Sequence, residues 1–230
     1  MNRFKYIFVL LITAVSIINK SSAQETEFGL IGGLNVSDLG NIPVGFGITT
    51  SSNTGFHLGA FVNIPLSFRF DFQPQFLYSQ LGSSLTSVGY DSTLTITQVN
   101  NITLSYIVIP LNFCYKFKGG WNIHAGPYIS FLLSDKEYIT QTVSQYGSTV
   151  NGGDTTTNTT QGDNKFDLGF SLGIGYTMQN GLGFNFSYST GLINVAQQQT
   201  YTDPSSGQTY TQPAFGLNNW YSFSISYLFR

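Results

Sequence analysis

The sequence predicts an all-β protein, an eight-stranded antiparallel up-and-down transmembrane β-barrel. Three observations support this fold class. Apolar and polar residues alternate with period two in eight segments of the chain. Charged residues make up only 9% of the chain and aromatic residues 16%, whereas soluble domains contain about 25% charged residues. The connections between the segments alternate between short and long, as they do in outer-membrane barrels.

The first residues are predicted to be a secretory signal peptide. Two basic residues precede the apolar run Tyr6–Ile18, which is too short to span a bilayer as a helix. The small residues Ser21 and Ala23 then mark a cleavage site. We therefore expect residues 1–23 to be removed and residues 24–230 to form a single barrel domain.

The eight alternating segments are each predicted to be one membrane-crossing strand. Successive side chains of a strand point to opposite faces, so that each segment has an apolar face and a polar face. A tilted transmembrane strand needs about 9–11 residues, and every segment reaches that length. In chain order the segments are residues 28–36, 56–64, 68–81, 102–117, 121–133, 166–176, 182–192 and 217–229.

The lengths of the connections predict the orientation of the barrel. An even number of strands places both termini on the rim that carries the short turns, which is the periplasmic rim in this class of protein. Asn180-Gly181 is a strong hairpin signal, because both residues tolerate positive φ. The short turns are residues 65–67, 118–120 and 177–181; the long connections, expected to be extracellular loops, are residues 37–55, 82–101, 134–165 and 193–216.

The volume of the barrel decides which face points inward. An eight-stranded barrel has an interior that is just wide enough for side chains to fill. Rows of Phe and Tyr would overfill this space, whereas Gly, Ser and Asn fit, so Phe170, Phe186 and Phe223 are predicted to face lipid. The alternative, a soluble lipocalin-like carrier, would bury the aromatic residues and would need a charged outer surface.

Three prolines interrupt the predicted strands, at Pro74, Pro110 and Pro127. Proline cannot donate a backbone hydrogen bond, and within sheets it is found at edges or bulges. Because a closed barrel has no edge, the sequence predicts a local bulge at each proline.

Four stretches of the chain stand out by their order and spacing: GLIGGLNVS (29–37), FQPQFLYSQLG (72–82), YIVIPL (106–111) and AGPYISFLLS (125–134). Together they resemble the PorT-like outer-membrane β-barrel family. The resemblance implies an eight-stranded barrel in the outer membrane of a Gram-negative cell, and the family name implies a component of protein secretion. Phe229 resembles the terminal aromatic signal that the barrel-assembly machinery reads, although Arg230 follows it.

The polar parity contains a few ionisable residues, which we expect to form a hydrogen-bond and ion-pair network inside the barrel. Cys114 is expected to pair with His124 across two strands, but this pair lacks the three or four ligands of a zinc site. No metal or other cofactor is predicted. The expected interior network consists of Arg69, Asp71, Lys116, His124 and Asp167.

Aromatic residues near the ends of the strands are expected to anchor the barrel, since amphipathic rings settle at the level of the lipid headgroups. The predicted anchors are Trp121, Tyr176, Tyr221 and Tyr227.

These features favour a non-enzymatic, monomeric outer-membrane barrel whose long loops have structural, adhesive or partner-binding roles. The alternatives are a small channel and a secretion-system component that binds other secretion proteins. His57 and Asp167 are predicted near the extracellular rim, where some outer-membrane enzymes carry a His/Ser/Asp set, but no serine stands out by motif. The chain has no basic patch, so nucleic acid is not an expected partner.

Overall fold

The computed structural model describes residues 25–40, 48–91, 94–145, 148–157, 164–202, 207–212 and 214–229. The predicted signal peptide, residues 1–23, lies outside the described residues. The described part forms the strands β1 (Glu27–Gly40), β2 (Ile48–Pro65), β3 (Phe70–Asp91), β4 (Leu94–Lys116), β5 (Trp121–Gln145), β6 (Ser148–Thr157), β7 (Phe166–Thr177), β8 (Leu182–Ala196), β9 (Gln199–Thr202), β10 (Thr209–Gln212) and β11 (Phe215–Phe229). None of its residues belongs to a helix long and apolar enough to cross a membrane.

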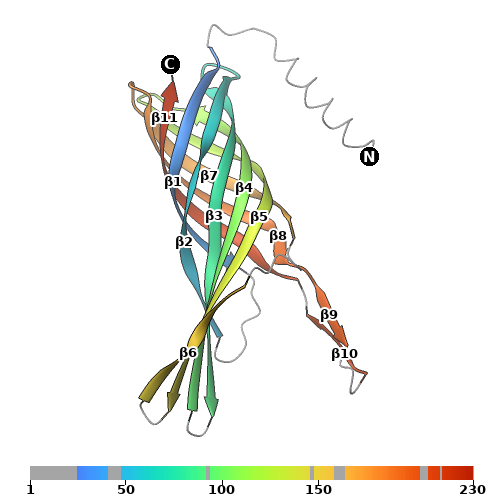
Figure 1. The fold of residues 1–230 in the computed structure, drawn as a ribbon. Helices are drawn as coiled ribbons and strands as arrows, with labels where there is room; N and C mark the ends of the chain where they lie inside the picture. Colours follow the sequence, from blue (N-terminus) through green and yellow to red (C-terminus); the bar gives the residue numbers. More distant parts are fainter. Residues whose placement is uncertain are drawn as a thin grey trace.

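Eight of these strands close into an antiparallel ring, which confirms the predicted fold class (Figure 1). Around the ring the order is β1, β2, β3, β4, β5, β7, β8 and β11, and β11 pairs with β1 to complete the circle. Phe28 lies opposite Phe229, so the start of β1 and the end of β11 lie side by side at one end of the barrel. The short turns after β2, β4 and β7 lie at this same end, which we call the termini end (Figure 1).

Two of the short turns contain glycines in the left-handed region. Gly119 and Gly120 have φ of +86° and +90°, and Gly181 has φ of +90°. Other residues rarely adopt this conformation. The Asn180-Gly181 hairpin predicted from the sequence therefore connects β7 to β8 as expected.

The aromatic side chains point away from the barrel axis. Phe170, Phe186 and Phe223 are 51%, 49% and 54% exposed. Their neighbours on the other parity, such as Ser171 and Ser222, are buried. The exposed apolar side chains thus form a belt around the outside of the barrel, as the volume argument predicts.

The strands are much longer than predicted on one side of the ring. The four strands β1, β7, β8 and β11 have 12 to 15 residues, but β3, β4 and β5 have 22, 23 and 25. Most of the expected loops 82–101 and 134–165 are therefore strand, not loop. The backbones of these segments pair with one another in continuous ladders. Their residues, mostly Thr, Ser, Gln and Val, did not by themselves predict strands, because β-propensity depends strongly on context.

These extensions form a sheet that projects from the barrel at the end opposite the termini (Figure 1). The register pairs Tyr90 with Thr95 between β3 and β4, and Val99 with Thr140 between β4 and β5. Strand β6 adds to the edge of β5. We call residues 84–91, 94–101, 137–145 and 148–157 the projecting sheet. A separate hairpin, β9–β10, projects at the same end (Figure 1).

The predicted bulges at the prolines are wrong. The register is unchanged across Pro74, Pro110 and Pro127. Each proline keeps its ladder partner on one neighbouring strand and loses it on the other, because its missing N–H faces only one side. Register shifts in the ring occur elsewhere, between Ser52 and His57, between Ser105 and Tyr106, and between Leu217 and Asn219.

Large inward side chains lie over glycines on neighbouring strands. His57 faces Gly33, His124 faces Gly173, and Tyr128 faces Gly169. A methyl group on Gly33 would lie 2.9 Å from His57 Cε1 and would clash with the Phe223 carbonyl oxygen. These glycines therefore create the room in which the narrow interior holds imidazole and phenol rings.

Candidate functional site

The interior at the termini end contains a cavity of about 170 Å³, which we call the vestibule. Its wall includes the ion pair between Lys116 Nζ and Asp71 Oδ1, which are 2.8 Å apart. The Asp71 side chain is buried, while that of Lys116 is partly exposed. The structure thus brings together two members of the predicted interior network.

Arg69 does not join this network. It lies in the turn before β3, where it is exposed, and its guanidinium donates to Tyr115 Oη at 3.1 Å. The prediction placed it inside because it extended the strand parity two residues beyond the start of β3 at Phe70. The interior near this rim therefore contains one ion pair, Asp71 with Lys116, within the described residues.

Asp71, Cys114 and His124 lie side by side on β3, β4 and β5. The predicted cross-strand pairing of Cys114 with His124 is therefore confirmed. Each of the three has its own neighbour: Asp71 pairs with Lys116, Cys114 Sγ donates to Gln73 Oε1 at 3.7 Å, and His124 Nδ1 is 3.4 Å from Asn122 Oδ1. The described residues include no group of His, Cys, Asp and Glu that could hold a metal ion.

The middle of the barrel is a hydrogen-bonded layer around His57. His57 Nδ1 is 2.9 Å from Asn35 Oδ1, and Nε2 is 2.8 Å from Ser224 Oγ. Asn35 Oδ1 also accepts from Ser222 Oγ at 2.9 Å, and Asn35 Nδ2 donates to Ser79 Oγ at 2.9 Å. Because Asn35 Oδ1 accepts, His57 donates from Nδ1 and accepts the Ser224 hydroxyl proton at Nε2.

The order Ser224, His57, Asn35 is that of a nucleophile, a base and an orienting residue. However, all three are buried, and the adjoining cavity has a volume of only about 40 Å³. This volume accommodates a few water molecules and no acyl substrate. The sequence prediction placed His57 near the extracellular rim together with Asp167. In the structure His57 lies in the middle of the barrel instead, and Asp167 belongs to a separate cluster. The layer therefore has the properties of a packed polar core.

The end of the barrel that faces the projecting sheet is filled by aromatic side chains. The rings of Tyr128 and Trp220 pack edge to face at 5.0 Å. Asp167 Oδ2 accepts from Tyr128 Oη at 3.0 Å and from Asn218 Nδ2 at 3.0 Å, and Asn218 Nδ2 is also 3.2 Å from Tyr106 Oη. Tyr106, Tyr128 and Asn218 are almost completely buried. We call Tyr106, Tyr128, Trp220, Asn218 and Asp167 the aromatic plug.

The sequence prediction found only Asp167 of this plug. The parity signal was available, since Trp220 shares the parity of Ser222 and Ser224, and Tyr106 shares that of Asn112 and Cys114. The sequence prediction did not place these rings in the interior, because it assumed that an eight-stranded barrel accommodates only small inward residues. Glycines opposite them, such as Gly169 opposite Tyr128, supply the missing volume.

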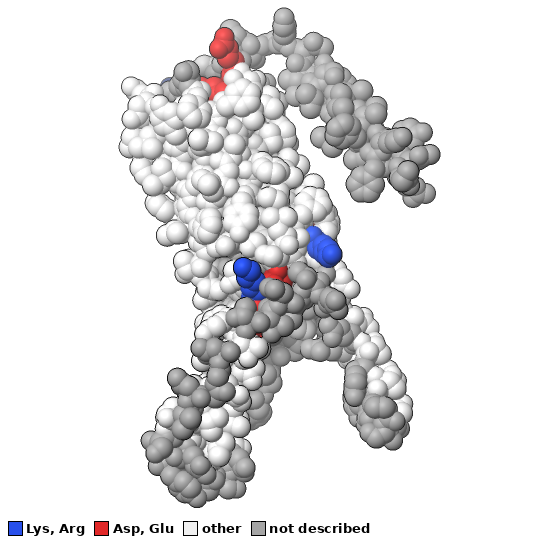
Figure 2. Space-filling view, in the orientation of Figure 1, with Lys and Arg blue, Asp and Glu red and all other residues white. Residues whose placement is uncertain are grey.

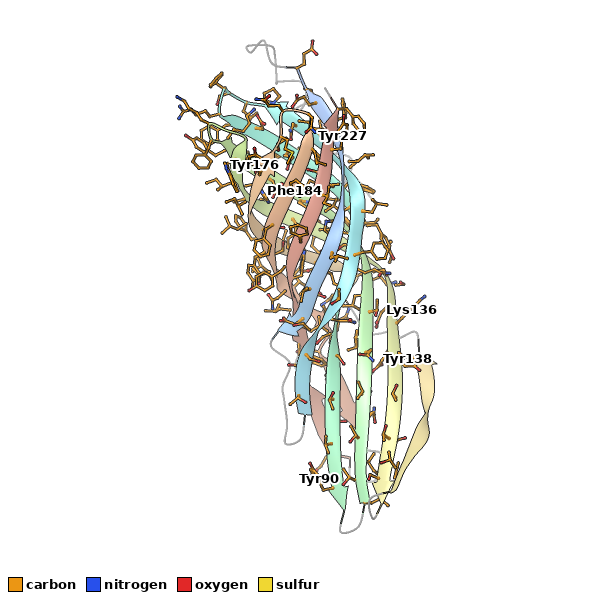
Figure 3. The ribbon with its side chains drawn as sticks, turned by 90° about the vertical axis from the view of Figure 1, so that its left-hand side faces the viewer. Tyr90, Lys136, Tyr138, Tyr176, Phe184 and Tyr227 are labelled. Atoms are coloured by element: carbon orange, nitrogen blue, oxygen red, sulfur yellow. The ribbon has the colours of Figure 1, made fainter. Side chains whose placement is uncertain are left out.

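The predicted aromatic anchors lie at both margins of the apolar belt. Trp121 and Tyr176 pack against each other at 5.1 Å near the termini end, and Tyr227 lies at the same end (Figure 3). Tyr221 lies at the other margin, where it packs against Tyr188 at 4.9 Å. The next outward residue on β11 is the polar Asn219.

Charge is absent from the surface between these margins on the face that Figure 2 shows. There, acidic side chains lie at the termini end, and acidic and basic side chains lie near the base of the projecting sheet (Figure 2). An uncharged apolar belt of this kind, bordered by aromatic residues, is the lipid-facing surface of a membrane barrel. A model of the outer membrane protein beta-barrel domain matches residues 21–197. The chain belongs to this outer membrane protein beta-barrel family.

Members of the outer membrane protein beta-barrel family reside in the outer membrane, and so does this chain. The match is to the family as a whole and does not single out the PorT-like members. All four stretches that resemble PorT-like proteins lie within strands of the barrel wall, namely β1, β3, β4 and β5. They therefore belong to the shared barrel.

Solved outer-membrane proteins have a similar fold at low sequence identity. The attachment invasion locus protein Ail of Yersinia pestis is 9% identical, with 90% of this chain and 100% of Ail covered and a TM-score of 0.41. For Neisserial surface protein A the identity is 10%, the coverage 90% and 100%, and the TM-score 0.38. The Escherichia coli outer membrane protease OmpT is also similar, at 6% identity, 92% and 99% coverage and a TM-score of 0.25.

None of the curated proteins matches this sequence.

Proposed function

We propose that this protein is a non-enzymatic outer-membrane barrel that holds a rigid β-sheet outside the cell for binding a partner. The single observation that carries the proposal is the length of β3, β4 and β5. A tilted strand crosses the bilayer in about 9–11 residues, whereas these strands have 22 to 25. The surplus of more than ten residues in each continues as one hydrogen-bonded sheet, which projects roughly 40 Å at about 3.3 Å per residue.

The surface of the projecting sheet suits a polar, uncharged partner. Its outward face carries Thr97 opposite Thr142 and Val99 opposite Thr140. Tyr90 is 80% exposed at the tip, and Tyr138 is exposed near the base (Figure 3). Exposed Tyr supplies contact area at low entropic cost and a hydroxyl for hydrogen bonding. Residues of this type support adhesion to a protein or another uncharged polar surface, in preference to binding nucleic acid.

The orientation is part of the proposal. Short turns and both chain ends lie at one end of the barrel, and the projecting sheet lies at the other (Figure 1). In outer-membrane barrels short turns face the periplasm and long connections face outward. The exposed Phe229 at the end of β11 is then placed where the barrel-assembly machinery could read it during insertion.

The interior supports a closed barrel more than a channel or an enzyme. The aromatic plug fills the end that faces the projecting sheet. The vestibule of about 170 Å³ and a second cavity of about 400 Å³ lie at the termini end, where both are lined by Asp71 and Lys116. The Ser224–His57–Asn35 chain has no space for a substrate beside it. The PorT resemblance also implies a role in protein secretion, but the four stretches that carry this resemblance lie in the barrel wall. Intact secretion in a strain that lacks this protein would refute a secretion role.

Two measurements test the proposal. An epitope tag inserted between Asp91 and Leu94 should bind antibody on intact cells. A variant in which residues 86–99 are replaced by Asn-Gly should keep its barrel, since the ring is closed by residues outside this segment, and should lose binding to the surface or partner that the full chain binds. Equal binding by both proteins, with the tag hidden on intact cells, would refute the proposed role and orientation.

A further inference from the structure

The wall of the barrel has a seam between β2 and β3. The ladder pairs Ile64 with Phe72 and Phe61 with Gln75, but the two positions between them are unpaired. Pro74 occupies one of these positions and has no N–H to donate. The backbone pairing of the wall is therefore interrupted here over two residue pairs, as it also is between β3 and β4 beside Pro110 and between β4 and β5 beside Pro127.

Side chains bridge the seam on its inner side. Gln73 Nε2 donates to Asn63 Oδ1 at 2.6 Å, and Gln75 Nε2 donates to Gln73 Oε1 at 3.0 Å. This row of amides lies on the inward face of β2 and β3. The outer side of the seam has no such bridge among the hydrogen bonds of the described residues.

A hollow of about 430 Å³ lies over the outer side of the seam. Its volume falls in the range of ligand pockets, about 300–1,000 Å³. Its lining includes the small Ala60 and Pro74. Phe61 and Gln75, whose side chains point inward, are also among its lining residues. Phe61 lines the vestibule as well.

The position of this hollow identifies what occupies it. Phe28, Phe76 and Phe229 surround it and are all exposed on the apolar belt. No charged residue lines it. Because the family places this belt in the outer membrane, the hollow opens toward hydrocarbon, and lipid chains are the molecules that border it.

We propose that an acyl chain of a membrane lipid binds in this hollow and contacts Phe61 and Gln75 through the seam. Such binding depends on the membrane location and is independent of what the projecting sheet binds.

Photolabelling tests the site. The full-length protein is reconstituted in phosphatidylcholine vesicles that contain a small fraction of the same lipid with a diazirine in its acyl chain. After irradiation, labelled residues are identified by mass spectrometry of peptides. We expect label on Phe61 and Gln75, and none on inward residues away from the seam such as Leu81 and Ser224. Label confined to outward residues would overturn the proposal.

Two matched variants test whether the acyl chain reaches Gln75 by way of the hollow. Ala60→Phe fills the hollow, whereas Ala125→Phe adds the same ring at an outward position on β5, opposite Phe113 and Leu172. Label on Gln75 should fall several-fold in Ala60→Phe and stay unchanged in Ala125→Phe. Unchanged label in Ala60→Phe would refute the route.

A third variant covers the case in which Ala60→Phe fails to fold. Pro74→Val supplies the missing N–H and keeps an apolar side chain, so the ladder can close across the seam. Label on Phe61 and Gln75 should then fall several-fold. If the labelling of these two residues persists in Pro74→Val, the seam is not the point of access and the proposal is wrong.

Discussion

His57 Nε2 lies 2.8 Å from Ser224 Oγ although the two residues belong to strands that are not neighbours. Strand β1 runs between β2 and β11, and its Gly33 is paired with both His57 and Ser224. The hydrogen bond passes over Gly33, which has no side chain to block it. The centre of the barrel is thus held together by a contact that spans three strands.

A side chain at position 33 should disrupt this contact. In Gly33→Ala, the new methyl group would lie 2.7 Å from Ser224 Cα and 2.9 Å from His57 Cε1. We expect a loss of about 1–3 kcal/mol in the free energy of unfolding, the usual cost of overpacking. Urea unfolding of the protein in lipid vesicles, followed by the fluorescence of Trp121 and Trp220, measures this loss.

Gly89→Ala is the matched control, because a methyl group there would meet its nearest atom at 4.0 Å. This substitution should change the free energy of unfolding by no more than about 0.5 kcal/mol. Equal stability of Gly33→Ala and Gly89→Ala would show that the residues around His57 can move to accept the new methyl group without loss of stability, which would contradict the prediction.

A charge in the middle of the apolar belt should be costly. Ile225 faces outward halfway along the belt on β11, and its side chain is exposed. We expect Ile225→Lys to lower the free energy of unfolding by about 2–4 kcal/mol, the cost of a cation at the bilayer midplane. Equilibrium unfolding in vesicles is the measurement.

Thr97→Lys on the projecting sheet provides the comparison. Thr97 faces outward on β4 well beyond the belt. In water this substitution should stay within about 0.5 kcal/mol of the wild type. A large loss of stability in Thr97→Lys together with a small loss in Ile225→Lys would mean that lipid surrounds the projecting sheet and not the apolar belt.

Removal of the aromatic plug should open the barrel. The double variant Tyr128→Ala, Trp220→Ala deletes the two packed rings between the polar layer and the projecting sheet. We expect the wild type to give no steady openings in planar bilayers and the double variant to conduct ions. Since a buried aromatic residue replaced by Ala costs about 3–5 kcal/mol, folding of the variant must be checked first.

Tyr128→Phe controls for the hydroxyl alone. It removes the hydrogen bond to Asp167 but keeps the ring, and the bilayer should remain sealed. Steady conductance in the wild type would contradict a closed barrel and would favour the channel alternative.

The ion pair of the vestibule should matter more than the other cation near that rim. Lys116→Met leaves the buried Asp71 carboxylate without its partner at 2.8 Å, and an unpaired buried polar group costs about 1–3 kcal/mol. Arg69→Met removes a cation that is exposed and bonded only to Tyr115 in the described residues, so its effect should be within about 0.5 kcal/mol. The free energies of unfolding in urea compare the two variants. A greater loss for Arg69→Met than for Lys116→Met would contradict the stabilising role of the ion pair.

The sequence predicted the wall of the barrel well, because a strand has a fixed period. Alternation places Phe223 outward and Ser224 inward whatever the neighbouring strands are. The Asn180-Gly181 turn is equally local, since positive φ is a property of those residues. The eight membrane strands and the lipid face therefore followed from short-range rules.

The length of the strands did not follow from these rules. The Thr, Ser and Asn residues of the projecting sheet have the composition of a loop, and their extended conformation depends on pairing between β3, β4 and β5. The prolines show the same limit. Whether the missing N–H of Pro74 makes a bulge or a gap depends on which neighbour it faces, and this is a property of the assembled register.

By itself the sequence determined the class of barrel, the number of membrane strands and the side that faces lipid, because these follow from the alternation of residues along a single strand. Only the tertiary structure decided what fills the interior. The ring that fits at Tyr128 depends on Gly169 of the adjacent strand, and the bond from His57 to Ser224 depends on Gly33 between them. Space inside a closed barrel is shared among strands that lie far apart in sequence, so no pattern within one strand can specify it.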